Sequence, residues 1–260
     1  MIDTHTHIYM PDRFPDGGIA AVDRAVEAGV DMMILPAIDR ESVDYMLTLH
    51  ARRPQNTAVA FGLHPTEVGS DWKAEVEDIM GHTSNAEIVA IGEIGLDLYW
   101  EKKYLSRQMD AFGYQLQLAI DLGLPAIVHT RNALEETCEV MNFFRSGLPT
   151  LVFHSFTAGI PEAEMLLESA PDAFFGINGV CTFKNSIGLR EAITRIDIKR
   201  IVTETDSPFL APVPHRGKIN ESSFLPHIIK VISEVRKEDE KKVERITVEN
   251  AHRLFPALRT

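Results

Sequence analysis

Cysteine is scarce in this sequence. Its 260 residues include two cysteines, Cys138 and Cys181, which do not form a CxxC pair. Frameworks of several disulfides belong to cysteine-rich chains in oxidising compartments, so the composition excludes a fold held together in that way. We expect a protein of the reducing cytosol, with a cytoplasmic location.

Long hydrophobic runs are also missing. No stretch approaches 18 consecutive apolar residues, and the start of the chain, Met1–His5, shows no basic segment followed by an apolar run. A transmembrane helix needs about 20 apolar residues, and a signal peptide needs the basic and apolar pair. The sequence therefore predicts neither of these segments and no membrane partner.

Basic residues are fewer than acidic ones. The chain has 26 Lys and Arg against 38 Asp and Glu, which gives a formal net charge of -12. Proteins that coat duplex DNA use many basic contacts to phosphates, so this composition argues against general nucleic-acid binding. One small, locally positive site for an anionic substrate remains compatible with it, because bound cations can dominate local electrostatics.

Short apolar runs recur along the chain, and each is followed by a helix-like stretch. They lie about 25–35 residues apart, the length of one βα unit, and they are continuous rather than alternating, as in buried parallel strands. The expected strands are Met1–His7, Met32–Pro36, Ala58–Leu63, Ile88–Glu93, Ala126–His129, Leu151–His154, Ala173–Ile177 and Ile201–Glu204. Eight such units predict an α/β fold, a (β/α)8 TIM barrel of one catalytic domain over residues 1–260. An open doubly wound sheet is the alternative.

Apolar stripes at helical spacing lie between the runs. The clearest predicts a helix that ends at Gly123, before Pro125, and comprises Met109, Phe112, Leu116, Ala119 and Ile120. A weaker stripe lies around Val43–Ala51, and another spans Phe224–Val235. Two further helical stretches, Lys241–Val248 and Asn250–Phe255, are expected to close the chain.

Two histidines end the first expected strand, in Asp3-Thr-His-Thr-His7. Residues i and i+2 of a strand face the same side, so His5 and His7 are expected to point together into the barrel mouth. Two imidazoles aimed at one point suit a metal ion. An HxH pair alone is a weak signal, because it also occurs in loops and in cores.

Four other strand ends strengthen that signal. Histidines or carboxylates end or closely follow four more of the eight expected strands, namely Glu93, His129, His154 and Asp206. In a barrel these ends ring one pocket, where active sites of the fold lie. Any one of the six could be a hydrogen-bonded polar residue without function. Four imidazoles and two carboxylates at matching places instead favour a metal centre that can hold two ions.

Other polar residues are candidates for substrate contact. His64 follows the third strand and could reach the pocket rim, and His215, Arg216 and Lys218 form a small basic loop that could hold an anionic group. An ordinary exposed loop is the alternative for the latter. Glu204 stands two residues before Asp206 on the expected strand face, where it could orient a ligand histidine or bind a nearby cation.

The sequence resembles TatD-type metal-dependent hydrolases, within the amidohydrolase-like barrels, almost from end to end. The matching motifs are Asp3–His7, Gly62–Pro65, Gly92–Asp97, Arg107–Gln108, His129–Arg131, His154–Phe156, Glu204–Pro208, Pro212–Lys218 and Asn250 with Arg253–Phe255. The resemblance implies a (β/α)8 barrel with two divalent metals. By this resemblance, one would be held by His5, His7 and Asp206 and the other by His129 and His154, with Glu93 bridging them. It also implies phosphate contacts from His64 and the loop 214–218. Ile8-Tyr9 departs from the commoner Leu-Asp pair of the family.

The resemblance also implies a phosphodiesterase, since family members include exonucleases that remove nucleotides from DNA ends. We expect Asp206 to orient or deprotonate the attacking water, with Glu93 as the second catalytic carboxylate. Four imidazoles favour zinc, manganese, iron or cobalt, although family nucleases are associated with magnesium. The expected partner is a single-stranded or frayed DNA end or a small phosphoester, met by a monomer or weak oligomer.

Two other functions remain open at this point. One is an amidohydrolase or lactonase that cleaves C–N or C–O bonds, although such barrels often bridge their metals with a carboxylated lysine. The corresponding run here ends in Glu93, with no lysine beside it. The other is a metal-binding protein without turnover.

Overall fold

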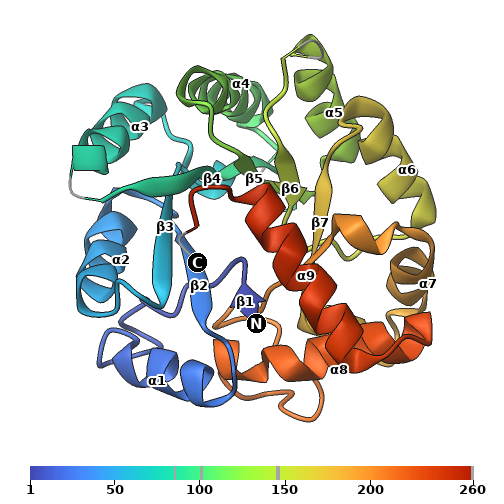
Figure 1. Cartoon of the computed structure of the whole chain (residues 1–260). Helices are drawn as coiled ribbons and strands as arrows, with labels where there is room; N and C mark the ends of the chain where they lie inside the picture. The colour runs from blue at the N-terminus through green and yellow to red at the C-terminus, as the bar shows by residue number, and fades with distance from the viewer. Residues whose placement is uncertain (85, 100–101, 145–146, 259–260) are drawn as a thin grey trace.

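The fold is a ring of eight parallel strands surrounded by helices. The computed structural model describes residues 1–84, 86–99, 102–144 and 147–258. The strands, joined in the order β1 to β8, are β1 Ile2–Asp3, β2 Met32–Pro36, β3 Thr57–Phe61, β4 Ile88–Asp97, β5 Ala126–Arg131, β6 Leu151–Phe153, β7 Phe174–Ile177 and β8 Ile201–Thr203. Figure 1 looks along the axis of this ring. The predicted (β/α)8 barrel is confirmed, and the open sheet is not found.

Most of the helices follow the strands and cover the outside of the ring (Figure 1). They are α1 Ile19–Glu27, α2 Arg40–Arg52, α3 Trp72–Gly81, α4 Leu105–Leu122, α5 Leu134–Phe143, α6 Ile160–Ser169, α7 Ile187–Arg195, α8 Leu225–Arg236 and α9 Glu240–Leu254. Short 3-10 turns are η1 Pro65–Glu67, η2 His82–Ser84, η3 Gly179–Thr182, η4 Ile198–Arg200 and η5 Ser222–Phe224. In the described part of the chain, no helix is both long and apolar enough to cross a bilayer.

Helix α4 shows how the sequence produces these elements. Phe112, Leu116 and Ala119 of the predicted stripe are buried, and Gly123 ends the helix in the left-handed conformation with a φ of 65°. Glycine adopts this conformation without the steric cost of a Cβ.

The first and last strands close the ring. Regular pairing of β1 stops at Asp3, but an isolated parallel bridge joins Thr6 to Ser207, beyond the end of β8. The Thr4 amide also donates a hydrogen bond to the Thr203 carbonyl at 3.1 Å. The first strand is therefore shorter than predicted, although the backbone around the two histidines remains tied to the last strand.

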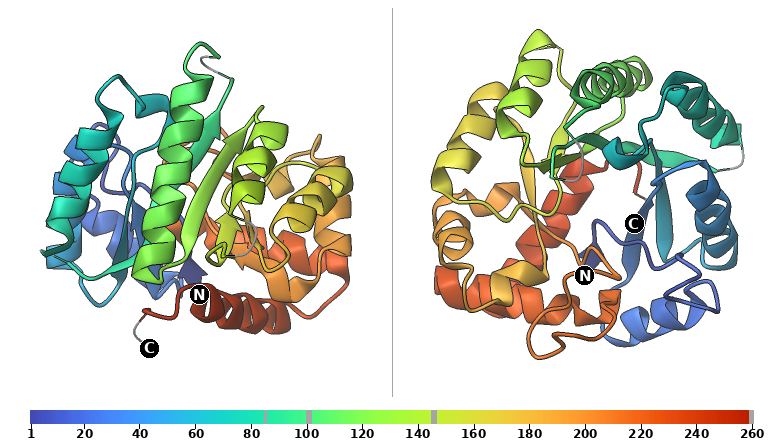
Figure 2. Two further views of the ribbon diagram at one scale, coloured as in Figure 1. Left: turned by 90° about the horizontal axis from the view of Figure 1, so that it is seen from above. Right: turned by 180° about the vertical axis from the view of Figure 1, so that it is seen from behind.

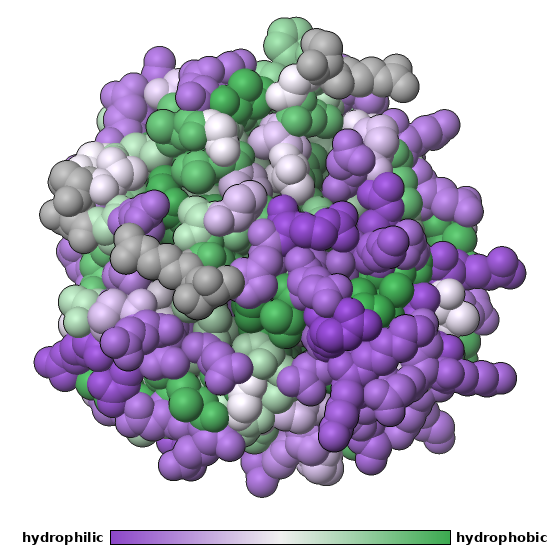
Figure 3. All heavy atoms as spheres, in the orientation of Figure 1, coloured by the Kyte–Doolittle hydropathy of each residue, from purple (hydrophilic) through white to green (hydrophobic). Residues whose placement is uncertain are grey.

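One helix covers the N-terminal end of the barrel. Figure 1 shows α9 lying across the ring of strands, and the side view in Figure 2 places it below their starts. Its residues Ala251 and Leu254, with the following Phe255, belong to the same apolar cluster as inward-facing strand residues such as Ile34 and Val202. On this face of the molecule, hydrophilic side chains gather toward the lower right, with hydrophobic ones between them and toward the upper left (Figure 3). Helix α9 thus seals one end of the barrel.

The prediction of two separate helices at the end of the chain is wrong, because α9 is continuous through Asn250. The buried Asn250 side chain donates hydrogen bonds to the carbonyls of Ile198 and Ile201, both at 2.7 Å. Asparagine has low helix propensity, but these tertiary contacts outweigh it.

Candidate metal centre

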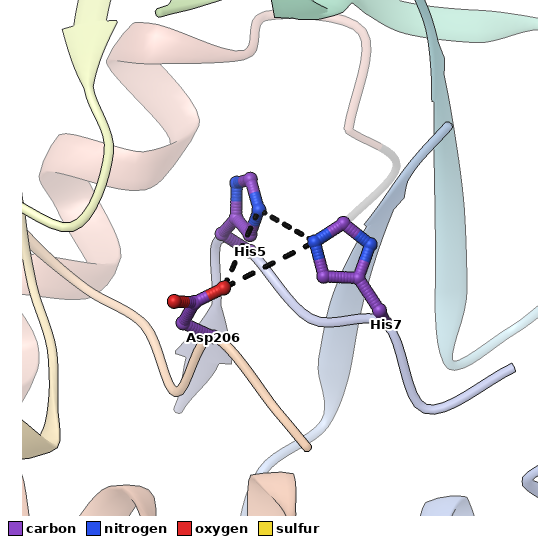
Figure 4. A group of neighbouring side chains, drawn as sticks. All are labelled: His5, His7 and Asp206. Carbon is purple, nitrogen blue, oxygen red and sulfur yellow. Dashed lines mark hydrogen bonds and ion pairs between the residues drawn. The ribbon is translucent and has the colours of Figure 1, made fainter. Parts of the chain in front are cut away.

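His5, His7 and Asp206 meet at the C-terminal mouth of the barrel. The bridge at Thr6 keeps this backbone extended, so that both imidazoles project to one side. The amide of His7 donates to the Ser207 carbonyl at 2.7 Å, and that of Asp206 donates to the His5 carbonyl at 2.9 Å. Figure 4 shows the three side chains pointing toward one another. Asp206 has a φ of 55°, a left-handed conformation that aspartate tolerates better than most residues.

Glu93 lies between two groups of imidazoles. Its Oε2 atom is 3.1 Å from Nε2 of His5 and 3.5 Å from Nε2 of His7. Its Oε1 atom faces the others, 2.6 Å from Nε2 of His154, 2.8 Å from Nδ1 of His129 and 3.3 Å from Nε2 of His64. One buried carboxylate therefore offers one oxygen to each group.

The backbone of β4 carries Glu93 into this position. Its pairing with β5 changes register between Ile91 and Ile94. Gly95 follows with a φ of 136°, and a Cβ there would lie 2.0 Å from the carbonyl oxygen of His129. Glycine at this position lets β4 approach β5 closely beside the site.

Imidazole nitrogens approach one another closely in both groups. Nε2 of His5 is 3.0 Å from Nε2 of His7, and Nδ1 of His129 is 3.1 Å from Nε2 of His154. Two ring nitrogens at such distances need a proton or a cation between them, because their lone pairs otherwise repel. Nitrogen and carboxylate donors of this kind suit divalent transition metals. Among the described residues, donor atoms within 4.8 Å of one another form three groups: His5, His7 and Asp206; His5, Glu93 and His154; and His64, Glu93 and His129.

Neighbouring ionisable side chains stabilise the charged forms of Glu93 and His154. Burial alone would raise the pKa of Glu93, but His154, His64 and His5 together lower it well below its ordinary value. Burial opposes the protonation of His154, yet Glu93 and Glu204 raise its pKa well above the ordinary value. A metal ion that replaces such protons meets a Glu93 carboxylate that is already anionic.

Asp206 and His5, which belong to the same group, have pKa values shifted in opposite directions. Burial raises the pKa of Asp206 to about 6, although His154 and His7 act in the opposite direction. Burial also lowers the pKa of His5 well below its usual value, so that this imidazole is neutral at pH 7. A neutral imidazole is the form that binds a metal.

Further carboxylates support the histidines from outside. Asp97 Oδ2 is 3.1 Å from Nε2 of His129, and the Gln108 side chain bonds the Asp97 backbone in both directions. Glu204 Oε1 accepts a hydrogen bond from the Ser155 amide at 2.5 Å and lies 3.7 Å from Nδ1 of His154. Metal-bound histidines commonly donate a hydrogen bond from their second ring nitrogen to a carboxylate in this way.

Asp97 was missed as a site residue by the sequence reasoning. It stands four residues after Glu93, within the motif Gly92–Asp97, and positions i and i+4 of a strand share a face. That spacing was the available signal.

A pocket of about 720 Å³ opens above the centre. Its lining includes most of the predicted ligands and His64. It also includes Arg131, from the end of β5, and Phe209, from the loop after β8. Neither was predicted as a site residue, because an arginine at a strand end and a phenylalanine in a loop give no periodic signal.

Four predicted substrate-binding residues do not line this pocket. Glu204 is fully buried below it, and strand β8 ends before Glu204, so the expected shared strand face with Asp206 is absent. The basic loop packs to one side. The His215 ring stacks on Phe224 with a centroid distance of 3.9 Å, and the Arg216 guanidinium lies over the Phe183 ring. Lys218, the fourth, is exposed.

Comparison with known proteins gives a consistent family. The model of the family described as TatD-related DNase matches residues 2–256. An uncharacterized metal-dependent hydrolase TatD of Mycobacterium tuberculosis is 30% identical, over 98% of this chain and 97% of that protein. A 3′-5′ ssDNA/RNA exonuclease TatD of Yersinia pseudotuberculosis is 35% identical, over 90% and 91%. The crystal structure of YJJV, a TatD homologue of Escherichia coli K12, matches with a TM-score of 0.89 and 28% identity, over 99% and 98%.

Proposed function

The chain belongs to the TatD-related DNase family of metal-dependent hydrolases, and from that premise we propose that it removes nucleotides from the 3′ ends of single-stranded DNA. The observation that carries the proposal is the placement of Glu93, whose two oxygens face separate groups of histidines beneath an open pocket. The direction of cleavage follows the names of relatives such as the Yersinia exonuclease.

Two divalent ions are part of the proposal. His5, His7 and Asp206 would hold one, and His129 and His154 the other, with Glu93 shared between them. Zinc or manganese suits the imidazoles, and magnesium suits the carboxylates. When bound, such ions make hydroxide available at neutral pH and stabilise charge on phosphodiester oxygens.

The chain's own groups would orient the reactants and move the proton. Asp206 is our candidate proton acceptor, because its carboxylate reaches the pocket and its pKa of about 6 leaves it ionised at pH 7. Glu204 would orient His154, and Asp97 would orient His129. We therefore assign Glu204 to positioning rather than to substrate contact.

Substrate contacts are proposed at two distances from the centre. His64 lies on the pocket wall, where it could donate to a phosphate oxygen next to the cleaved bond. His215, Arg216 and Lys218 lie outside the pocket lining, so they suit phosphates of nucleotides further along the strand. Binding of this kind weakens as salt rises.

The proposal further treats residues 1–260 as one catalytic domain. A cytoplasmic location is also part of it, since Cys138 and Cys181 are buried free thiols.

An amidohydrolase or lactonase is the main rival. Among the described residues that line the pocket there is no lysine to serve as a carboxylated bridge, and Glu93 instead offers one oxygen to each group of histidines. This observation favours the phosphodiesterase.

The proposal is tested with purified protein and single-stranded oligonucleotides labelled at the 3′ or 5′ end, in magnesium, manganese or zinc. We expect mononucleotides released from the 3′ end by wild type and none by His5→Ala or Asp206→Ala. A blunt duplex should be degraded more slowly, given the net charge of -12. Intact oligonucleotides under all three metals, together with hydrolysis of a lactone or amide, would establish the rival.

A further inference from the structure

We infer that Phe209 stacks on a base of the bound 3′ end and thereby sets the enzyme's preference for unpaired nucleotides. This inference rests on the proposed exonuclease function and adds the residue that recognises the substrate. Aromatic rings bind single-stranded nucleic acid through the faces of the bases, which are hidden in a duplex.

Phe209 is an apolar ring kept in an exposed place. Phe209 lines the pocket, although 46% of the residue is accessible to solvent. A phenyl ring of this size is stabilised by burial, so its exposure beside a metal centre suggests a ligand that covers it. It stands three residues after Asp206, and its amide donates to the Asp206 carbonyl at 2.9 Å. The backbone of Phe209 is therefore tied to that of a proposed ligand.

Asn220 holds the loop in place from below. Its fully buried side chain donates to the carbonyl of Thr205 at 2.7 Å and to that of Phe209 at 2.6 Å. Its own amide donates to the Pro208 carbonyl at 3.1 Å, and its carbonyl accepts from the Ser207 hydroxyl at 2.7 Å. An exposed ring on so firmly bonded a backbone binds with little loss of conformational entropy.

The turn η3 supports the loop from the other side. A Cβ on Gly179 would lie 2.2 Å from the carbonyl oxygen of Leu210, so only glycine permits this packing. The hydroxyl of Thr182 also accepts a hydrogen bond from the Val213 amide at 2.8 Å. Val180 of the same turn lines the pocket with Phe209 and Leu210. These three residues form an apolar wall.

Polar groups occupy the wall on the β3–β5 side. His64 follows β3, and Thr130 and Arg131 end β5. In the closed ring, β5 lies three strands from β8, which precedes the apolar wall. A nucleotide matches this division, since its base is flat and apolar on its faces and its phosphate is anionic.

The test compares oligonucleotides that differ by one base. Phe209→Ala and Phe209→Trp are assayed on a single strand with all its bases and on strands with an abasic site at the terminal or the penultimate 3′ position. We expect Phe209→Ala to raise KM about tenfold on the complete strand, with kcat changed far less. Phe209→Trp should restore the wild-type KM. On one of the two abasic strands the effect of Phe209→Ala should vanish.

Phe143→Ala is the matched control, because Phe143 is 86% exposed at the end of α5 and does not line the pocket. Its KM should equal that of wild type, and all variants should unfold at similar temperatures. An equal effect of Phe209→Ala on complete and abasic strands overturns the inference while the exonuclease function stands. Wild-type protein that cleaves none of the strands overturns both.

Discussion

The two ends of the barrel are built from different chemistry. At the N-terminal end, α9 covers apolar strand residues, and Leu254 and Phe255 are fully buried among them. At the C-terminal end the site is built from buried ionisable side chains, and His5, Glu93 and Glu204 are each no more than 2% accessible. The same ring of strands thus carries a sealed apolar core at one end and a concentrated polar site at the other.

This difference separates stability from function. Apolar burial stabilises the N-terminal end without further partners. Burial of charge at the C-terminal end is costly unless other charges or a metal offset it. TIM barrels generally place catalytic groups at the C-terminal ends of their strands. Substitutions at the two ends should therefore affect different measurements.

The largest effect is expected from Glu93→Ala. It removes the carboxylate that faces both groups of histidines, and a bound metal contributes several kcal/mol to the transition state. The value of kcat/KM on a 3′-labelled strand should fall at least about a thousandfold. Glu249→Ala, a change at an exposed carboxylate of α9, is the control and should leave it unchanged. Activity of Glu93→Ala within tenfold of wild type would contradict the proposed site.

Phe255→Ala should instead lower the stability of the protein and leave its activity unchanged. It leaves a cavity beneath the barrel, so the free energy of unfolding should fall by about 3–5 kcal/mol. Urea unfolding measures this loss, and kcat/KM of the folded protein should stay at the wild-type value. A matching fall in kcat/KM would show that the two ends are coupled.

Metal should stabilise the protein in a pH-dependent way. The pKa of Asp206 is about 6 in the fold against an ordinary 3.8, so the stability contributed by its protonated form is lost as pH rises through about 6. Metal needs the ionised form and should therefore stabilise most above that pH. At one fixed concentration, 100 times the Kd that applies at pH 7.5, metal should raise Tm by about 5–10 °C at pH 7.5 and by less at pH 5.5, where its Kd is higher. A larger gain at pH 5.5, measured by calorimetry, would refute this assignment.

The smallest of these effects is expected from Glu204→Gln. The amide keeps an oxygen for the Ser155 N–H but loses the charge beside His154. Metal affinity, measured by titration, should fall about 10–100-fold. Unchanged affinity with a raised KM would instead make Glu204 a substrate contact.

Much of this molecule could be predicted from local patterns. Buried parallel strands need continuous apolar runs, so all eight strands were found within a few residues of their bounds. Strand ends of a barrel converge, so residues as distant as His5 and Asp206 could be brought together in advance.

The remaining features depend on contacts between distant residues. Asn250 sits inside a helix because of carbonyls about 50 positions away, and no local pattern reports them. The loop at His215 lies outside the pocket lining, because its side chains stack on Phe224 and Phe183. Phe209 reaches the pocket through the bonds of Asn220 to its loop. Propensity and periodicity describe none of these interactions.

The central claim is that Glu93 joins two metal ions at the mouth of the barrel. Elemental mass spectrometry of the purified protein after dialysis against zinc or manganese tests it most directly, with Glu93→Ala measured beside wild type. We predict two ions for each wild-type chain and a loss of at least one in the variant. One ion or none in wild type, or two retained in Glu93→Ala, would contradict the claim.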